Sequence, residues 1–413
     1  MKIWEILHFP QYTIKENMMK LDESKFSSIP VGRLGIIAME SCSELGKKVD
    51  EYLVKWHKER EEKGVAFPFN ESQKDTYLLE ATCPRFGSGE AKALIKESVR
   101  GVDLYILVDV LNHSIKYSLC GNQNSMSPDD HYQDLKRIIS ATNNKTKNIT
   151  VIMPFLYESR QHKRSYRESL DCALALQELD AMGVNNNITF DAHDPRVQHA
   201  IPSSGFDNVM PTYQFIKALL KSTDDLQIDS DHMMIISPDE GAMSRAMYFS
   251  SVLGVDIGMF YKRRDYSTIV NGRNPIICHE FLGDSVEGKD VLIIDDMISS
   301  GESMFDVARE LKRRKAKRVF CISTFGLFTN GLEKFDKCYE EGIIEKVITT
   351  NLTYQRPDLF ERPWYVSADM SKYIAILIES INHDTSISAL IDPAARIKAR
   401  LEEYKLTHTI KED

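Results

Sequence analysis

The fold of this chain is constrained most by residues 291–303, where a continuous apolar run ends in two adjacent aspartates and a turn of small, hydroxyl-bearing residues. After the turn, apolar residues recur at helical spacing as far as Leu311, and three cations follow, Lys312, Arg313 and Arg314. This order predicts a buried parallel strand, a loop and an amphipathic helix with a cationic last turn. In open α/β sheets ligands bind at the carboxyl ends of such strands, so this loop is the first candidate site.

The loop after the strand suits a phosphate, because backbone N–H groups and hydroxyls gather there at a helix N-terminus. Its members are Ser299, Ser300, Gly301 and Ser303. Asp295 and Asp296 stand one step earlier, where carboxylates can accept hydrogen bonds from a ribose diol or bind a metal. A simpler interpretation is that the two aspartates only cap the helix, since acidic residues are common at helix starts.

Composition argues against several classes of protein. The 413 residues are 42% apolar and 27% charged, which is ordinary for a globular chain, and the length favours two or three domains. A net charge of −9 argues against a partner that is nucleic acid or an anionic membrane. Without a run of about 18 apolar residues or a secretory signal, we expect no membrane span and no export. Seven cysteines with no CxxC pair disfavour a disulfide framework and fit the reducing cytoplasm.

Strands and helices alternate along the chain, which predicts an α/β fold with two doubly wound domains. Residues 1–30 are polar and without pattern and are expected to form an N-terminal extension. We expect the first domain over 31–208 and the second over 209–391. The last helix of the second domain, 371–381, is in a position to pack back on the first domain, and residues 392–413 are expected to form a polar tail.

Several segments stand out within this alternation. Residues 57–75 and 112–126 are polar and aperiodic, and we expect inserted loops there, whereas 76–81 is predicted to be a strand. Residues 127–130 are a strong helix start, with a serine at the N-cap, proline at the first helical position and acids in the first turn. The stretch 262–275 begins with three cations and has no periodicity.

With its elements arranged in this way, the chain resembles ribose-phosphate pyrophosphokinases (PRPP synthetases) from about residue 35 to 391. Residues 291–303 resemble the PRPP signature that these enzymes share with type I phosphoribosyltransferases. Five further matches follow the family's order: 86–90 with 97–103 (ATP loop), 154–163 (Arg-Gln loop), 191–193 (metal-contacting segment), 237–241 (pyrophosphate loop) and 262–264 (flexible catalytic loop). The resemblance implies two tandem type I phosphoribosyltransferase-like domains, each a mainly parallel sheet flanked by helices.

The resemblance also implies an activity and its residues. These enzymes transfer the diphosphoryl group of ATP to the 1-hydroxyl of ribose 5-phosphate with Mg²⁺, giving 5-phosphoribosyl 1-diphosphate (PRPP) and AMP for nucleotide biosynthesis, and they form homo-oligomers. The implied sites are Lys262 and Arg264 for catalysis; Phe86, Ser88, Glu90, Arg160 and Gln161 for ATP; His193 and Asp239 for Mg²⁺; and Asp295, Asp296, Ser299, Ser300, Gly301 and Ser303 for ribose 5-phosphate.

Each of these residues also has an ordinary structural interpretation. A Lys-Arg-Arg triplet is usually a solvated surface patch, His193 at a strand end is more often a structural histidine, and Phe86 is by default a core residue. The chain has neither an HExxH zinc motif nor a GxxxxGK[ST] phosphate loop, so ATP would not bind through a Walker A site.

The phosphate loop departs from the family pattern. Where the family usually has Asp-Thr-x-Gly-Thr, this chain has Ser-Ser-Gly-Glu-Ser at 299–303. Ser299 lacks a carboxylate that would face the ribose, and Glu302 brings a negative charge that repels phosphate unless it points away or is paired. Two alternatives therefore stay open: a catalytically silent homologue that binds PRPP or nucleotides, and a phosphoribosyltransferase acting on a base, which predicts one domain with a hood.

Overall fold

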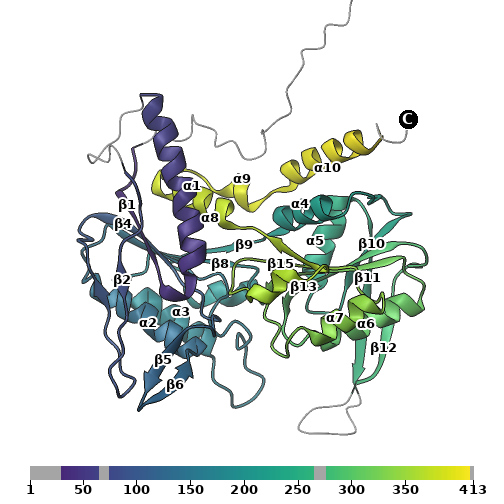
Figure 1. Ribbon diagram of the computed structural model, residues 1–413, viewed down its shortest axis with the longest axis horizontal. Coiled ribbons are helices and arrows are strands. Elements are labelled where there is room, and N and C mark those ends of the chain that lie inside the picture. The colour runs from purple at the N-terminus through teal and green to yellow at the C-terminus, as the bar shows by residue number, and fades with distance from the viewer. Residues whose placement is uncertain (1–28, 65–73, 265–275, 410–413) are drawn as a thin grey trace, which may run out of the picture.

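A five-stranded parallel sheet forms the centre of the first half of the chain (Figure 1). The computed structural model describes residues 29–64, 74–264 and 276–409. The strand order is β1 (Arg33–Ala38), β4 (Val102–Leu107), β7 (Asn148–Ile152), β8 (Asn186–Phe190) and β9 (Gly205–Val209). All six residues of β4 are buried, as expected for a parallel strand that is covered on both faces.

Three long helices connect the strands of this sheet: α1 (Ser43–Glu62), α2 (Pro128–Ala141) and α3 (Asp171–Ala181). The predicted start of α2 is present as a complete capping box. The Ser127 side chain accepts from the Asp130 backbone N–H, and the Asp130 carboxylate accepts from the Ser127 N–H. This satisfies two N–H groups that the first turn of a helix leaves without partners.

A seven-stranded sheet forms the second half, and the β13 strand of the phosphate-loop motif lies at its middle. The order is β12 (Ile276–Leu282), β11 (Asp256–Arg264), β10 (Met233–Ser237), β13 (Asp290–Ile298), β14 (Arg318–Gly326), β15 (Lys346–Thr350) and β16 (Tyr365–Ala368). All neighbours are parallel except β11 and β12. Helices α4 (Thr212–Ser222) and α5 (Met243–Leu253) cover one face, and α6 (Glu302–Arg313) and α7 (Glu333–Glu340) cover the other (Figure 1). The predicted architecture, two α/β domains that are each a mainly parallel sheet flanked by helices, is confirmed.

Helix α8 (Ser371–Asn382) returns to the first domain after the second sheet is complete. It packs along α1 and contributes Tyr373, Ile374 and Leu377 to the core of the first sheet. Its end is fixed by polar contacts, because Glu379 pairs with Arg60 at 2.5 Å and Asn382 Nδ2 donates to Asp103 Oδ2 at 2.9 Å. The two domains are therefore joined by a shared core element as well as by the chain between them.

Residues 392–409, the described part of the C-terminal segment 392–413, are not the polar tail that the sequence predicts. After α9 (Ser388–Ile391), residues Ala394–Thr409 form helix α10, which lies along α4 and α5. Three buried side chains at spacings of four and three, Ile397, Leu401 and Tyr404, make this contact. Only one narrow apolar stripe is present among charged residues, which explains why composition suggested a tail.

Two predictions in the first domain need correction. Residues 112–126, expected to be a loop, contain a hairpin of β5 (Lys116–Leu119) and β6 (Asn122–Ser125), whose turn has Cys120 and Gly121 at positive φ. Such turns are recognised in sequences by Asn-Gly or Asp-Gly, and this one has neither.

The strand expected at 76–81 is reduced to one bridge between Leu78 and Ile36 and to the short β2 (Ala81–Thr82), which pairs with β3 (Leu94–Ile95). Its start is held instead by Asp50. That carboxylate accepts from the Tyr77 backbone N–H at 2.7 Å and from the Thr76 hydroxyl at 2.8 Å.

The aperiodic stretch at 262–275 lies only partly within the described residues. The backbone of Lys262–Arg264 belongs to β11, with Lys262 opposite His279 and Arg264 opposite Ile276 of β12. The side chains of these cations, residues 265–275, residues 65–73 of the first expected insertion and residues 1–28 lie outside the described residues. Among the helices that are described, none is long and apolar enough to cross a membrane.

Candidate active site at the domain boundary

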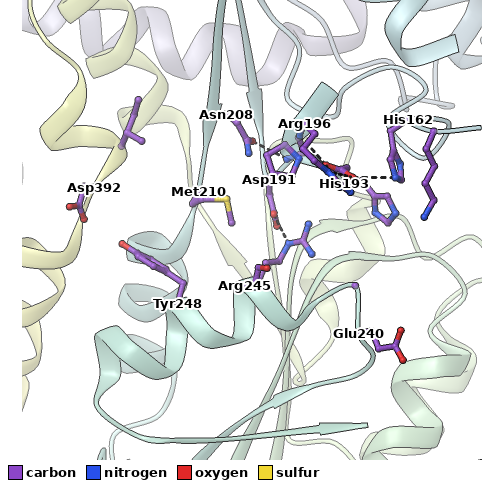
Figure 2. A pocket seen from close by; sticks show the side chains of 17 residues that line it. His162, Asp191, His193, Arg196, Asn208, Met210, Glu240, Arg245, Tyr248 and Asp392 are labelled. Carbon is purple, nitrogen blue, oxygen red and sulfur yellow. Dashed lines mark hydrogen bonds and ion pairs between the residues drawn. The ribbon is translucent and has the colours of Figure 1, made fainter. Parts of the chain in front are cut away.

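A cavity of about 760 Å³ opens where the carboxyl ends of strands from both sheets meet (Figure 2). Its walls come from the segment after β8, the end of β9, the start of α5, the basic loop before α3 and the residues after α9. The main polar lining residues are His162, Lys163, Asp191, His193, Asp194, Arg196, Asn208, Glu240, Arg245, Tyr248 and Asp392.

His193 connects this cavity to the strand that carries the phosphate loop. The residue follows the end of β8 in the first domain, and its Nδ1 lies 2.6 Å from Asp296 Oδ2 on β13 of the second. With Nδ1 donating to the carboxylate, the neutral ring has Nε2 as its acceptor atom. The ring is about one-third exposed and lies near that of His162, with 5.4 Å between ring centroids. The contact brings together two residues that the sequence assigned to different parts of the site.

Arg245 lies beneath His193 and binds two buried carboxylates. Its Nε is 2.5 Å from Asp191 Oδ1, and its Nη2 is 3.8 Å from Asp296 Oδ2. The second oxygen of Asp191 accepts from the Thr324 hydroxyl at 2.6 Å. Figure 2 shows the Arg245 side chain extending from α5 toward Asp191. Asp191 belongs to the first domain and both of its partners to the second, so the network spans the boundary.

The two adjacent aspartates of the motif have opposite pKa shifts. Burial acts to raise the pKa of Asp296, but the hydrogen bond from His193 and the charge of Arg245 outweigh it and lower that pKa. Burial, and then the neighbouring Asp296 charge, raise the pKa of Asp295 well above its usual value. Two carboxylates this close do not both ionise easily. Of the pair, Asp296 is thus the carboxyl whose ionised form is favoured, and Asp295 the one whose ionised form is disfavoured.

Asp239 lies in the turn after β10, the segment that the sequence assigned to pyrophosphate. Its Oδ1 accepts from the backbone N–H of Gly241 at 3.0 Å and of Ala242 at 3.3 Å, which shapes the turn at the start of α5. In the described part of the chain, no cluster of three or more His, Cys, Asp or Glu side chains is arranged to hold a metal ion. A cation near His193 and Asp239 would therefore take most of its ligands from water or from a bound phosphate.

Residues 299–301 connect strand β13 to helix α6, the strand–loop–helix order that the sequence predicts, and Glu302 at the start of α6 pairs with a lysine of α7. Gly301 has φ 82°, and a Cβ at this position would lie 2.6 Å from Phe335 Cζ and 2.9 Å from Phe305 Cζ. Only glycine fits here without strain. Glu302, at the first turn of α6, forms an ion pair with Lys334 of α7. The added negative charge of Glu302 is thereby paired with a cation.

The residues predicted to bind ATP do not line this cavity. Phe86, Ser88 and Glu90 form a separate turn, in which the Ser88 hydroxyl donates to Glu90 Oε2 at 2.8 Å and the Phe86 ring is 53% exposed. Arg160 is exposed, and Gln161 Nε2 donates to the Ser169 carbonyl at 2.8 Å within its own loop. The two residues that follow Gln161 in the basic loop, His162 and Lys163, do line the cavity.

Sequence reasoning missed Arg245 and Thr324 and did not assign a role to Asp191. No local signal distinguishes these residues, because Arg245 is one cation in an ordinary helix and Thr324 one hydroxyl in a buried strand. Asp191 and Arg245 are 54 positions apart, and Asp191 and Thr324 are 133 apart. Their pairing depends on how the two sheets are arranged in space, and no local pattern in the sequence predicts that arrangement.

Two family models match the chain in the order of its two sheets. Residues 34–183 match the N-terminal domain of ribose phosphate pyrophosphokinase, and residues 206–353 match the phosphoribosyl transferase domain. The chain is 29% identical over 320 residues to the ribose-phosphate pyrophosphokinase of Vibrio parahaemolyticus, an alignment that covers 76% of this chain and 92% of that protein. Its identity to the enzyme of Vibrio cholerae is 28% over 319 residues, with the same coverage.

A solved structure shares the overall arrangement of the two domains. The phosphoribosylpyrophosphate synthetase of Mycobacterium smegmatis matches 85% of this chain and 99% of its own with a TM-score of 0.64, at 21% sequence identity. This structural similarity supports the fold. Membership of the family rests on the two domain models and on the sequence similarity to the Vibrio proteins. This chain therefore belongs to the ribose-phosphate pyrophosphokinase (PRPP synthetase) family, as a divergent member.

Proposed function

We propose that the chain is a ribose-phosphate diphosphokinase, which transfers the diphosphoryl group of ATP to the 1-hydroxyl of ribose 5-phosphate and releases PRPP and AMP. The observation that carries this proposal is the 2.6 Å contact between His193 and Asp296. It joins the candidate metal-contacting segment of one domain to the candidate ribose-phosphate strand of the other, beside a cavity of about 760 Å³. Cavities of this size are typical of small-molecule sites.

Ribose 5-phosphate would bind at the end of β13. Its 5-phosphate would accept hydrogen bonds from the backbone and hydroxyls of the phosphate loop, formed by Ser299, Ser300, Gly301 and Ser303. The carboxyl groups of Asp295 and Asp296 would meet the ribose hydroxyls, from which carboxylate oxygens can accept hydrogen bonds. The loop remains suitable for an anion because Lys334 is paired with Glu302.

The residues at the strand ends fit Mg²⁺ as a partial set of ligands. His193 and Asp239 would hold the ion together with water and phosphate oxygens, because Mg²⁺ keeps several waters and uses few protein ligands. The ion would supply positive charge that offsets the negative charge of the phosphate oxygens as the bond between the β-phosphorus and the oxygen of the leaving AMP breaks. The role of this chain's residues is to hold those oxygens in position and to leave His193 Nε2 facing them.

Lys262 and Arg264 are the proposed catalytic cations. Strand β11 runs parallel to β10, and its Met259 is level with Ser237, the last residue of β10. Lys262 and Arg264 therefore lie on the part of β11 that extends beyond the end of β10, and Asp239 follows that same end of β10. Cations here would stabilise charge that develops as the 1-hydroxyl attacks the β-phosphorus in line, so that positioning and charge neutralisation provide most of the catalysis.

The remaining parts of the proposal come from the family. ATP is the proposed donor, and Phe86, Ser88, Glu90, Arg160 and Gln161 keep their proposed role in binding it. We also propose a cytoplasmic homo-oligomer. A silent regulatory homologue is the second candidate, favoured by the altered phosphate loop at Ser299 and Glu302. A phosphoribosyltransferase acting on a base is less compatible with two similar domains.

The test is AMP and PRPP formation from ATP, Mg²⁺ and ribose 5-phosphate by the full chain, followed by chromatography. Lys262→Ala is expected to abolish turnover, because a proposed transition-state cation is removed. Lys315→Ala, which removes an exposed lysine two residues beyond the end of α6 that pairs with Glu287, is the matched control and should keep it. A folded sample that binds ATP but forms no PRPP would overturn the enzyme proposal in favour of the silent regulator.

A further inference from the structure

We propose that Arg245 is a positioning residue that holds the two domains in register at the reaction centre and thereby sets the direction of the His193 ring. The inference deepens the proposed function and rests on it for its kinetic test. Arg245 is distinct from the residues proposed to meet substrate, because its side chain is only 10% exposed and is engaged with protein carboxylates.

The contacts of Arg245 close a ring of interactions across the domain boundary. Arg245 binds Asp191 of the first domain at 2.5 Å and approaches Asp296 of the second at 3.8 Å. Asp296 in turn accepts from His193 Nδ1, and His193 follows Asp191 by two residues in the chain. The contacts thus connect four residues in a ring: Asp191, Arg245, Asp296 and His193. We expect the loss of any one of these contacts to move the imidazole of His193, which faces the cavity.

The backbone of this circuit is held in an uncommon conformation. Asp191 has φ 44°, in the left-handed region that non-glycine residues seldom adopt. Its N–H donates to the Val209 carbonyl at 3.0 Å, and the following Ala192 N–H donates to Asn208 Oδ1 at 2.9 Å. Residues in such conformations persist where their surroundings determine them and cluster at functional sites. The segment that carries His193 is therefore a fixed turn whose side-chain anchor is Asp191.

A cation is required at this place for an electrostatic reason. The side chains of Asp191 and Asp296 are 3% and 6% exposed, so their charges are poorly screened by water. Two buried carboxylates that approach each other repel, and each keeps its charge only when it is paired and hydrogen-bonded. Arg245 supplies a planar group that can meet both carboxylates at once, which a lysine ammonium does less well. Without it, repulsion would separate the end of β8 from β13.

Measurements of kcat and KM distinguish an arginine that positions another residue from one that binds substrate directly. An arginine that binds substrate equally in the ground and transition states changes mainly KM, whereas one that aligns another catalytic group changes mainly kcat. In Arg245→Met we expect kcat to fall roughly 100-fold, as about 1 Å of misplacement can cause, with the KM values for ATP and ribose 5-phosphate changed less than about threefold. Arg245→Lys should recover part of the loss because it restores the charge without the fork.

A matched control is Arg318 at the start of β14, which binds the end of β13 opposite to Asp296. Arg318 is also largely buried, and its Nη2 lies 2.6 Å from Asp290 at the start of β13, far from the cavity. Arg318→Met is expected to lower stability while kcat stays within about twofold of the wild type, because it breaks the ion pairs with Asp290 and Asp225, which do not reach the site. If Arg245→Met does not fold, Arg245→Lys and Thr324→Val, which removes the second partner of Asp191, carry the same test.

A spectroscopic measurement tests the inference without activity. In protein labelled with ¹⁵N-histidine, the Nδ1 proton of His193, assigned with His193→Gln, should give a hydrogen-bonded signal in the wild type and in Arg318→Met. That signal should be lost or shifted in Arg245→Met. An unchanged signal, an unchanged kcat, or a raised KM at full kcat in that variant would each overturn the positioning role. If the wild type shows no turnover, the proposed function fails, and the His193 signal alone decides this inference.

Discussion

Glu302 and Lys334 form an ion pair between the first turn of α6 and the start of α7, next to the loop that is proposed to bind the 5-phosphate. The two side chains are 49% and 57% exposed, so the pair is screened by water and contributes little to stability. Its consequence is local: the carboxylate at the N-terminus of α6, where the 5-phosphate is proposed to bind, has a cation beside it. The altered phosphate loop thus has a compensating residue 32 positions further along the chain.

This pair gives a prediction for substrate binding. Lys334→Met should raise the KM for ribose 5-phosphate about threefold to tenfold, because the Glu302 charge is left beside the phosphate, while kcat changes little. Adding Glu302→Gln should return the KM to near its original value. Lys337→Met, which removes a cation of the same helix paired with Glu341, is the control. Equal effects of Lys334→Met with and without Glu302→Gln would show that the pair has no part in binding.

Gly301 gives a prediction for stability. Gly301→Ala should lower the free energy of unfolding by about 2–3 kcal/mol, because it combines an unfavourable φ with a clash against Phe335 and Phe305. Gly342 has φ 66°, but a Cβ added there would meet no atom within 4 Å, so Gly342→Ala should cost only about 1 kcal/mol. Denaturant unfolding measures both. Equal costs would mean that the close approach of the two aromatic rings has no energetic effect.

Asp109 gives a prediction for the pH dependence of stability. It is buried at the domain boundary and accepts from the Tyr354 backbone N–H at 2.6 Å, and burial raises its pKa to about 7. A carboxyl whose folded pKa exceeds its unfolded value binds an extra proton in the folded state between these two pH values. The stability due to Asp109 is therefore complete below about pH 4 and is lost as the pH rises to about 7, by up to about 4 kcal/mol.

The measurement is the difference in free energy of unfolding between wild type and Asp109→Asn at a series of pH values. This difference should fall between about pH 4 and pH 7, where Asp109 titrates and the asparagine does not. Above that range it should be level, because Asp109 is then ionised in both the folded and the unfolded state. A difference that is constant over the whole range would show that the pKa of Asp109 is not raised in the folded protein.

Helix α10 gives a prediction about the C-terminal segment. Ile397 is fully buried against the second domain, so Ile397→Ala should cost about 2–4 kcal/mol of stability and lower the melting temperature. Leu406 lies on the same helix but is 64% exposed, and Leu406→Ala should change stability by less than about 0.5 kcal/mol. If the two variants melt alike, the helix does not pack on the domain as described.

The parts of this protein that its sequence determined are those set by neighbouring residues. The buried run before Asp295, the capping box at Ser127 and the glycine of the phosphate loop each depend on contacts or dihedral angles within a few positions. The family motifs extended this to the fold class, because their order along the chain was informative. The hairpin turn at Cys120 and helix α10 escaped prediction because their local signals are weak.

Tertiary structure alone decided how the charged groups are paired. His193 and Asp296 are 103 positions apart, and Asp109 and Tyr354 are 245 apart, yet both pairs are in hydrogen-bond contact. Such pairs form where strands of two different sheets end at a common boundary, and the order of strands is not written in any local pattern. Burial at that boundary then makes each pairing strong and shifts the pKa values, because charges there are poorly screened by water. The sequence named the groups that carry the chemistry, and the fold assigned their partners.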